Sequence, residues 1–173
     1  TRRSSDLNAA LEGDLDLTES GFSITIQGAG TASTFIDQLV LDRVFHVFSG
    51  VIVELRDLTV MHGTAVDNGG SGDMPGSGGR GGAILNAGGD LKLATTILDL
   101  NIAQGSLATE GGGAIYQSSG SLNLTNSVNG ETRLTNNAVS GNDGAGGALF
   151  LAGGSVISNN MRMTGNEAAG NGG

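Results

Sequence analysis

The sequence has no cysteine and no tryptophan, and its 173 residues include a single proline, a single tyrosine and a single lysine. A chain without cysteine can form neither disulfide bonds nor a thiolate metal site. No apolar run reaches the roughly 18 residues that a membrane span needs, so no span is predicted. The net charge of −9 and the lack of a basic cluster argue against nucleic acid as a partner.

Glycine, in contrast, is abundant, with 32 residues. It does not recur at every third position as in collagen. The isoleucine, leucine and valine residues between the glycines argue against disorder. The length suits one domain with a buried core.

The strongest pattern is a Gly-Gly-Ala-apolar tetrad that occurs three times, at intervals of 31 and 34 residues: 81–84, 112–115 and 146–149. A period of this size is typical of repeat proteins. An alternating apolar segment begins nine residues after the second glycine of each tetrad, at Leu91, Leu122 and Val156. Each repeat then carries an apolar-x-x-Asn element: Leu98–Asn101, Leu134–Asn137 and Met163–Asn166. The middle repeat is longer, which fits an insertion near 127–131.

Residues 42–61 carry the same apolar skeleton without the tetrad. In the alignment that the apolar pattern favours, Val51 takes the position of Leu91. Met61 then takes the position of Asn101, so this earlier repeat lacks the asparagine.

Each repeat contains three short alternating segments, which are too short for helices and too numerous for a βαβ fold. Three strands and three turns can close one coil, and such coils stack about 4.8 Å apart. The sequence therefore predicts an all-β fold, a parallel β-helix solenoid with coils of 31–34 residues. Glycine pairs suit corners that need positive φ or close backbone approach. The asparagines are expected at another corner, because asparagine tolerates the left-handed conformation and stacked amides can hydrogen-bond from coil to coil.

The chain divides into four predicted parts. Thr1–Leu7 resembles the in-frame translation of a sequencing adapter, as in reading frames from environmental DNA, and is set aside as a non-native scar. Residues 8–19 could form an N-terminal cap, since Asn8–Gly13 favours a short helix that ends at the glycine. Residues 20–173 are predicted to be a β-helix fragment, truncated at both ends. Within this fragment, residues 64–80 form a long glycine-rich loop.

The tetrad combined with apolar-x-x-Asn resembles the repeats of chlamydial-type polymorphic outer-membrane proteins, in which the second motif reads Phe-x-x-Asn. Leucine or methionine replaces the phenylalanine here. Segments 24–30, 42–45 and 58–60 resemble large bacterial surface proteins of the CSLREA type. Their leading Cys-Ser-Leu-Arg-Glu-Ala element is not visible, unless 7–11 is its remnant. The resemblance covers residues 20–173 and implies a right-handed parallel β-helix in a secreted or outer-membrane-associated bacterial protein.

We therefore expect a non-catalytic structural or adhesive segment, such as the stalk of an autotransporter or adhesin passenger, outside the cell or at its surface. No catalytic, cofactor-binding or metal-binding residue is assigned, and no cofactor is expected. The expected partners are host or neighbour-cell surface proteins or glycans, and the rest of a longer chain. Four loops would present the contact surface: 64–80, 104–111, 127–131 and 141–146. The loops that precede the tetrads are expected to stack at one corner.

The alternative is a carbohydrate-active β-helix, similar to a polysaccharide lyase or glycoside hydrolase, with its catalytic coil outside the fragment. A glycosidase needs two carboxylates across the scissile bond. Asp14 with Asp16, or Asp37 with Asp42, could supply such a pair. The basic residues that a lyase would use are scattered among different repeat positions: Lys92, Arg56, Arg133 and Arg162.

Two groups of residues could be considered for metal binding. His46 and His62, the only histidines, could form a proton relay or a metal pair. No carboxylate spacing supports this, so exposed or corner positions are expected for both. Asp67, Asp73 and Asp143 lie in glycine-rich loops that could bind calcium, with an acidic surface loop as the simpler interpretation. The run that ends at Asp73 falls one residue short of the calcium-binding nonapeptide and is not repeated in tandem.

Overall fold

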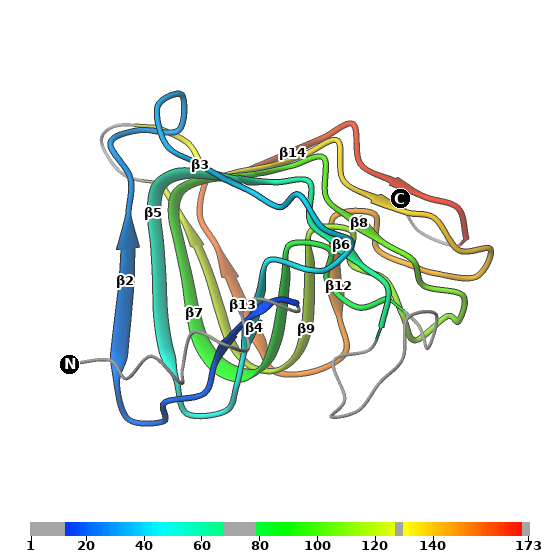
Figure 1. Cartoon of the computed structure of the whole chain (residues 1–173), viewed down its shortest axis with the longest axis horizontal. Coiled ribbons are helices and arrows are strands. Elements are labelled where there is room, and N and C mark those ends of the chain that lie inside the picture. Colours follow the sequence, from blue (N-terminus) through cyan, green and yellow to red (C-terminus); the bar gives the residue numbers. More distant parts are fainter. Residues whose placement is uncertain (1–12, 68–78, 127–129, 171–173) are drawn as a thin grey trace.

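The computed structural model describes residues 13–67, 79–126 and 130–170, and every regular element within them is a β-strand. All pairings between these strands are parallel. The structure is therefore all-β with long parallel sheets, as Figure 1 shows. The strands are β1 (Leu15–Leu17), β2 (Ser23–Gln27), β3 (Phe35–Asp37), β4 (Phe45–Val47), β5 (Ile52–Met61), β6 (Thr64–Ala65), β7 (Ile84–Asp99), β8 (Ile102–Ala103), β9 (Ile115–Thr125), β10 (Arg133–Thr135), β11 (Ala138–Val139), β12 (Leu149–Leu151), β13 (Ser155–Ser158), β14 (Arg162–Thr164) and β15 (Glu167–Ala168).

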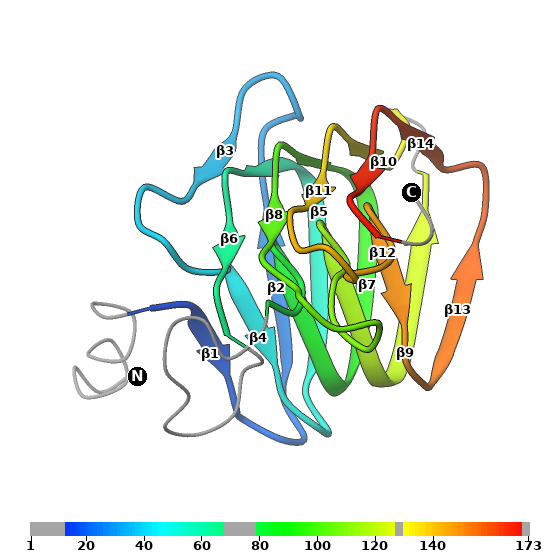
Figure 2. The ribbon, with the colours of Figure 1, turned by 90° about the vertical axis from the view of Figure 1, so that its right-hand side faces the viewer.

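Most strands belong to one continuous sheet that has three strips, because β5, β7 and β9 are long and pair in more than one strip. The first strip runs from β1 through β4 and the beginnings of β7 and β9 to β12. The second runs from β2 through β5, β7 and β9 to β13. The third runs from β3 through the ends of β5 and β7 to β10 and β14. Residues one repeat apart thus lie side by side, and the colours in Figure 2 follow the sequence across the second strip.

The core consists of apolar columns, each built from equivalent residues of successive repeats. Three of them are Leu15–Phe45–Ile84–Ile115–Leu149, Ile24–Val53–Leu91–Leu122–Val156 and Ile36–Val60–Leu98–Leu134–Met163. The inner members are almost fully buried and pack in one cluster. Full burial of an aliphatic side chain stabilises a fold by about 1.5–3 kcal/mol, so these columns supply the main driving force. Of the predicted apolar positions, Leu91, Leu98, Leu122, Leu134 and Val156 lie in or pack against this core, whereas Met163 is 47% exposed.

The tetrad glycines form a corner for the two reasons that the sequence suggests. Gly112 has a φ of 66°, and its equivalents Gly81 and Gly146 have 68° and 67°, a region that disfavours any side chain. Gly113 has no room for a side chain, because a Cβ there would lie 2.1 Å from the carbonyl oxygen of Gly147 in the next repeat. The first glycine is needed for its conformation and the second for close approach.

The recurring asparagines form a ladder at another corner, which confirms that prediction. Oδ1 of Asn137 accepts hydrogen bonds from the backbone N–H and from Nδ2 of Asn101, at 3.0 and 2.9 Å. Oδ1 of Asn166 accepts the two equivalent hydrogen bonds from Asn137, also at 3.0 and 2.9 Å. Each Nδ2 also donates to a backbone carbonyl of the preceding repeat, at Val60, Leu98 and Leu134. Each amide therefore bridges two repeats.

The left-handed residue at this corner is the one before each asparagine, not the asparagine itself. Leu100, Asn136 and Gly165 have φ values of 56°, 52° and 66°. The expectation that the ladder asparagine takes this conformation is therefore wrong. The chain turns one residue earlier, and the asparagine is selected for the contacts of its amide.

The predicted register of segment 42–61 is wrong by two residues in β5 and by one residue in β4, where Phe45 pairs with Ile84. Val53 pairs with Leu91. Gly63 consequently takes the ladder position, where its N–H donates to Oδ1 of Asn101 at 2.9 Å. A shift of two residues leaves every side chain on the same face of the strand, so apolar alternation cannot detect it.

A second sheet, with strand order β15-β11-β8-β6, extends from the ladder corner. Strand β6 occupies the start of the predicted loop 64–80, of which 68–78 lie outside the described residues. Beyond this sheet, isolated parallel bridges join Arg80 to Gly111 and Gly111 to Ala145. The ends of the three loops before the tetrads thus stack at one corner, as predicted.

The N-terminal predictions fall largely outside the described residues. Thr1–Leu7 lies wholly outside them, and so does the expected cap helix apart from Gly13. The rest of the predicted cap contains β1, which pairs with β4 as part of the first strip. Among the residues that the structure describes, no helix is long and apolar enough to cross a membrane.

Candidate functional site

The polar residues of the N-terminal repeats converge around one buried arginine. Leu15 and Leu17 of β1 face the core, so the alternating Asp14 and Asp16 face outward, and Asp16 pairs in register with His46 of β4. We call the whole group the Arg43 cluster: Asp14, Asp16, Asp42, Arg43, His46 and Asp67.

Arg43 is 1% exposed and holds three segments together. Its Nη1 donates to the carbonyl oxygen of Arg80 at 2.6 Å, and its Nη2 donates to the carboxylate of Asp67. Its Nε lies 2.6 Å from Oδ2 of Asp14. This last contact is an ion pair and not a hydrogen bond, because the Nε–H does not point at an acceptor among the described residues. A buried charge that loses its partners costs about 3–5 kcal/mol, so the cluster fixes the first strip to the loop edge.

Burial sets the protonation of the Arg43 cluster. It raises the pKa of the Asp14 and Asp16 carboxyls above the usual range, although the neighbouring charge of Arg43 acts in the opposite direction. The pKa of Asp42 is raised by burial and by the charge of Asp14. Burial, reinforced by the charge of Arg43, lowers the pKa of His46 to about 4. The imidazole is therefore neutral at physiological pH.

Three members of the cluster could offer ligands to one cation. The ligand atoms of Asp14, Asp16 and His46 all lie within 4.8 Å of one another, and Oδ1 of Asp16 is 3.5 Å from Nδ1 of His46. Two carboxylates and a neutral imidazole are donors that suit transition metals. Arg43 already occupies one side of Asp14, and its charge opposes a second cation there. The expectation that the chain has no metal site stays a prediction.

The two histidines do not meet as a relay pair, because each contacts a different aspartate. His62 is exposed at a corner, with a φ of 60°, and its Nδ1 lies 2.7 Å from Oδ1 of Asp37. His46 is buried, contrary to the expectation of an exposed or corner position, because it stacks on Phe48 with ring centroids 3.9 Å apart.

The other predicted site residues lie apart from one another. Of the proposed carboxylate pairs, Asp14 and Asp16 come together. Asp37 and Asp42 do not, because Asp37 contacts His62 at the end of the third strip and Asp42 belongs to the Arg43 cluster. Asp143 is exposed, and Asp73 lies outside the described residues.

The basic residues form two pairs on different strips, so the prediction that all four occupy different repeat positions is wrong for Arg133 and Arg162. Arg56 and Lys92 both contact Glu54, at 3.3 and 3.0 Å, on the second strip. Arg133 and Arg162 pair in register on the third strip. None of them contacts the Arg43 cluster among the interactions of the described residues. Among the residues that the structure describes, Arg43 is therefore the arginine or lysine that forms ion pairs within this site.

A second feature, an aromatic column, attaches the stacked loop edge to the first strip. The ring of Tyr116 stacks on the ring of Phe150, with centroids 5.0 Å apart. The guanidinium of Arg80 lies over the Tyr116 ring, 5.1 Å from the centroid of that ring. The Tyr116 hydroxyl donates to the carbonyl oxygen of Thr109 at 3.0 Å. Sequence reasoning missed this column, although both aromatic residues directly follow the apolar residue of a tetrad.

Comparison of the chain with protein-family models, with curated proteins and with solved structures found no match.

Proposed function

We propose that this chain is a stretch of right-handed parallel β-helix from a secreted or surface-exposed bacterial protein, where it acts as a non-catalytic stalk that presents loops. The parallel strips support the coil arrangement, since each repeat contributes one strand to every strip. The resemblance of the tetrad and ladder motifs to polymorphic outer-membrane protein repeats supports the location.

The observation that carries the proposal is the stacked loop edge. Successive loops leave the fold after the second sheet and return in register at Arg80, Gly111 and Ala145. Between these fixed ends the loops carry exposed residues, such as Leu107, which is 57% exposed. A rigid frame with a row of exposed loops along one edge is the arrangement by which repeat proteins make extended contact surfaces.

Location is tested by labelling intact bacterial cells that carry the native gene with antibodies against the 173-residue chain. The proposal expects labelling without permeabilisation and loss of the signal after external protease treatment. A signal that requires permeabilised cells would place the protein inside and contradict the proposal.

Presentation is tested by binding of the purified chain to host-type cells and to a glycan array. Replacing the exposed loop residues 106–109 with glycine and serine should abolish binding while the far-ultraviolet circular dichroism stays unchanged. Gln27→Ala is the matched control, because this residue is exposed on β2, away from the loop edge. Equal loss of binding in both variants would contradict a role of the loops.

One observation favours the alternative, a carbohydrate-active β-helix. Asp14, Asp16 and His46 converge on the outer side of the first strip, and burial raises the pKa of both carboxyls. Such environments recur where a carboxyl acts as an acid. Release of reducing ends or of unsaturated products from acidic polysaccharides, lost in Asp16→Asn, would favour the enzyme over the stalk.

A further inference from the structure

The last described repeat presents an open face made of β12, β13, β14 and β15, which we call the C-terminal face. Among the described residues, these strands pair on one side only, with β9, β10 and β11. Met163 is 47% exposed there, whereas its column neighbours Leu134 and Leu98 are 0% exposed. The same apolar column that is sealed inside the molecule is thus uncovered at this end.

The asparagine ladder is incomplete at this face. The backbone N–H groups of Gly63, Asn101 and Asn137 each donate to the Oδ1 of the ladder asparagine in the following repeat. The N–H of Asn166 has no acceptor among the described residues. The carbonyls that accept from the ladder Nδ2 groups belong to Val60, Leu98 and Leu134. The next residue in this series is Met163 on the edge strand β14.

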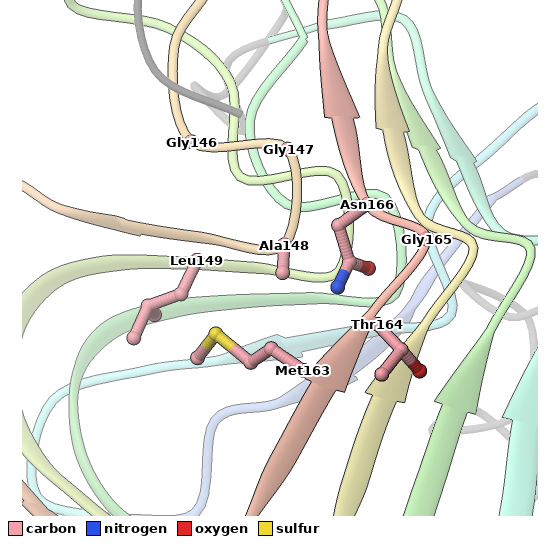
Figure 3. Close-up of a pocket in the computed structure, with 8 residues that line it drawn as sticks. All are labelled: Gly146, Gly147, Ala148, Leu149, Met163, Thr164, Gly165 and Asn166. Carbon is pink, nitrogen blue, oxygen red and sulfur yellow. The ribbon is translucent and has the colours of Figure 1, made fainter.

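A pocket marks the place where the missing amide would lie. Figure 3 shows Ala148, Leu149 and Met163 extending into the same space beside Asn166. The pocket is lined by Gly146, Gly147, Ala148, Leu149, Met163, Thr164, Gly165 and Asn166, which are the tetrad and the ladder element of one repeat. In the preceding repeat the equivalent positions are covered by these same residues.

From this geometry we infer that the C-terminal face is a docking site for one more coil that carries Gly-Gly-Ala-apolar and apolar-x-x-Asn. The inference rests on the coil arrangement in the proposed function. The docked asparagine would accept from the N–H of Asn166 and donate to the carbonyl of Met163. Its tetrad would lie against Gly147, where a Cβ would already be 2.5 Å from the oxygen of Glu167 and only glycine fits.

A second copy of the chain is the poorer occupant. Its opposite end carries the partly buried Ile24 and Ile36, which belong to the same columns as Val156 and Met163 and could continue them. However, the residue three positions after Ile36 is Leu39, which has no amide to complete the ladder. Head-to-tail stacking of copies would bury apolar surface but leave the Asn166 N–H unpaired.

The test extends the chain by one coil. Residues 142–170 are duplicated directly after Gly170, replacing 171–173, so that the appended coil carries its own tetrad and ladder asparagine. The control has alanine at the appended asparagine. Hydrogen–deuterium exchange of the peptide that spans 162–168 is compared with that of the original chain.

We expect exchange in this peptide to slow about tenfold or more in the extended chain, and clearly less in the alanine control. Unchanged exchange, or equal slowing in both extended chains, would overturn the inference. Slowing in the original chain as its concentration rises would also overturn it, because the occupant would then be a second copy. The surface-labelling result is independent of these outcomes, so failure here leaves the proposed location standing.

Discussion

Replacing Asn137 with alanine should strongly destabilise the protein. The side chain is fully buried, accepts from the backbone N–H and Nδ2 of Asn101, and donates to the carbonyl of Leu98. The Nδ2 of Asn101 keeps its contact with the carbonyl of Val60. Two backbone groups therefore lose a partner, and each unsatisfied buried group costs about 1–3 kcal/mol. We expect the free energy of unfolding to fall by about 2–6 kcal/mol.

Urea unfolding followed by circular dichroism measures this loss, with two control variants. Asn142→Ala changes an exposed loop asparagine and should shift the free energy by less than about 0.5 kcal/mol. Asn166→Ala removes the same kind of contacts where the side chain is only partly buried, so water can replace them and the loss should be smaller. If Asn137→Ala were as mild as Asn142→Ala, the ladder would not contribute to stability and our reasoning would be refuted.

Three further predictions use the same unfolding assay. Gly113→Ala should lower the free energy of unfolding by about 3 kcal/mol or more, because its Cβ would lie 2.1 Å from a backbone oxygen. Gly21→Ala is the control: no atom lies within 4 Å of its Cβ, so only the strain of the positive φ remains, at about 1 kcal/mol. Arg43→Met should cost about 3–5 kcal/mol by leaving the partly buried carboxylates of Asp14 and Asp67 unpaired, and the half-exposed Arg56→Met less than about 1 kcal/mol; equal effects would contradict the cluster's role. The lowered pKa of His46 means that its contribution to stability is complete above pH 6.5 and is lost as the pH falls toward about 4. Over this pH window, the free energy of unfolding of the wild type should fall by up to about 3 kcal/mol more than that of His46→Gln. The raised carboxyl pKa values act in the opposite direction, but they do so in both proteins and therefore cancel in the comparison.

The repeat region could be predicted well from the sequence because its signals are local and recur. Gly112 and Gly113 follow backbone requirements that any repeat must meet at the same corner, so spacing alone locates them. The ladder from Asn101 to Asn166 is likewise fixed by a constant offset from the apolar column. Where these markers are missing, as in 42–61, the period-two pattern accepts any even shift and the register is lost.

The Arg43 cluster could not be predicted because no repeat specifies it. Its members lie in β1 and β4, just before these two strands, and shortly after β6. Only the tertiary arrangement brings Asp14 and Asp67 to the same guanidinium. Asp14 and Asp16 were paired correctly because outward alternation on one strand is a local rule. The second sheet could not be predicted either, because two-residue strands such as β8 are too short to show a periodicity in the sequence.

The parallel strips also determine how the molecule would respond to mechanical load. In the described residues, each main strip joins a repeat only to the repeats before and after it. A force that pulls the two ends apart along the stacking direction would therefore act on one seam at a time and peel the terminal repeat first. Each released repeat of 31 or 34 residues would add about 100 Å of extended chain. In the repeats that carry the tetrad, stretching would dissipate energy in steps that the asparagine ladder and the glycine corner resist.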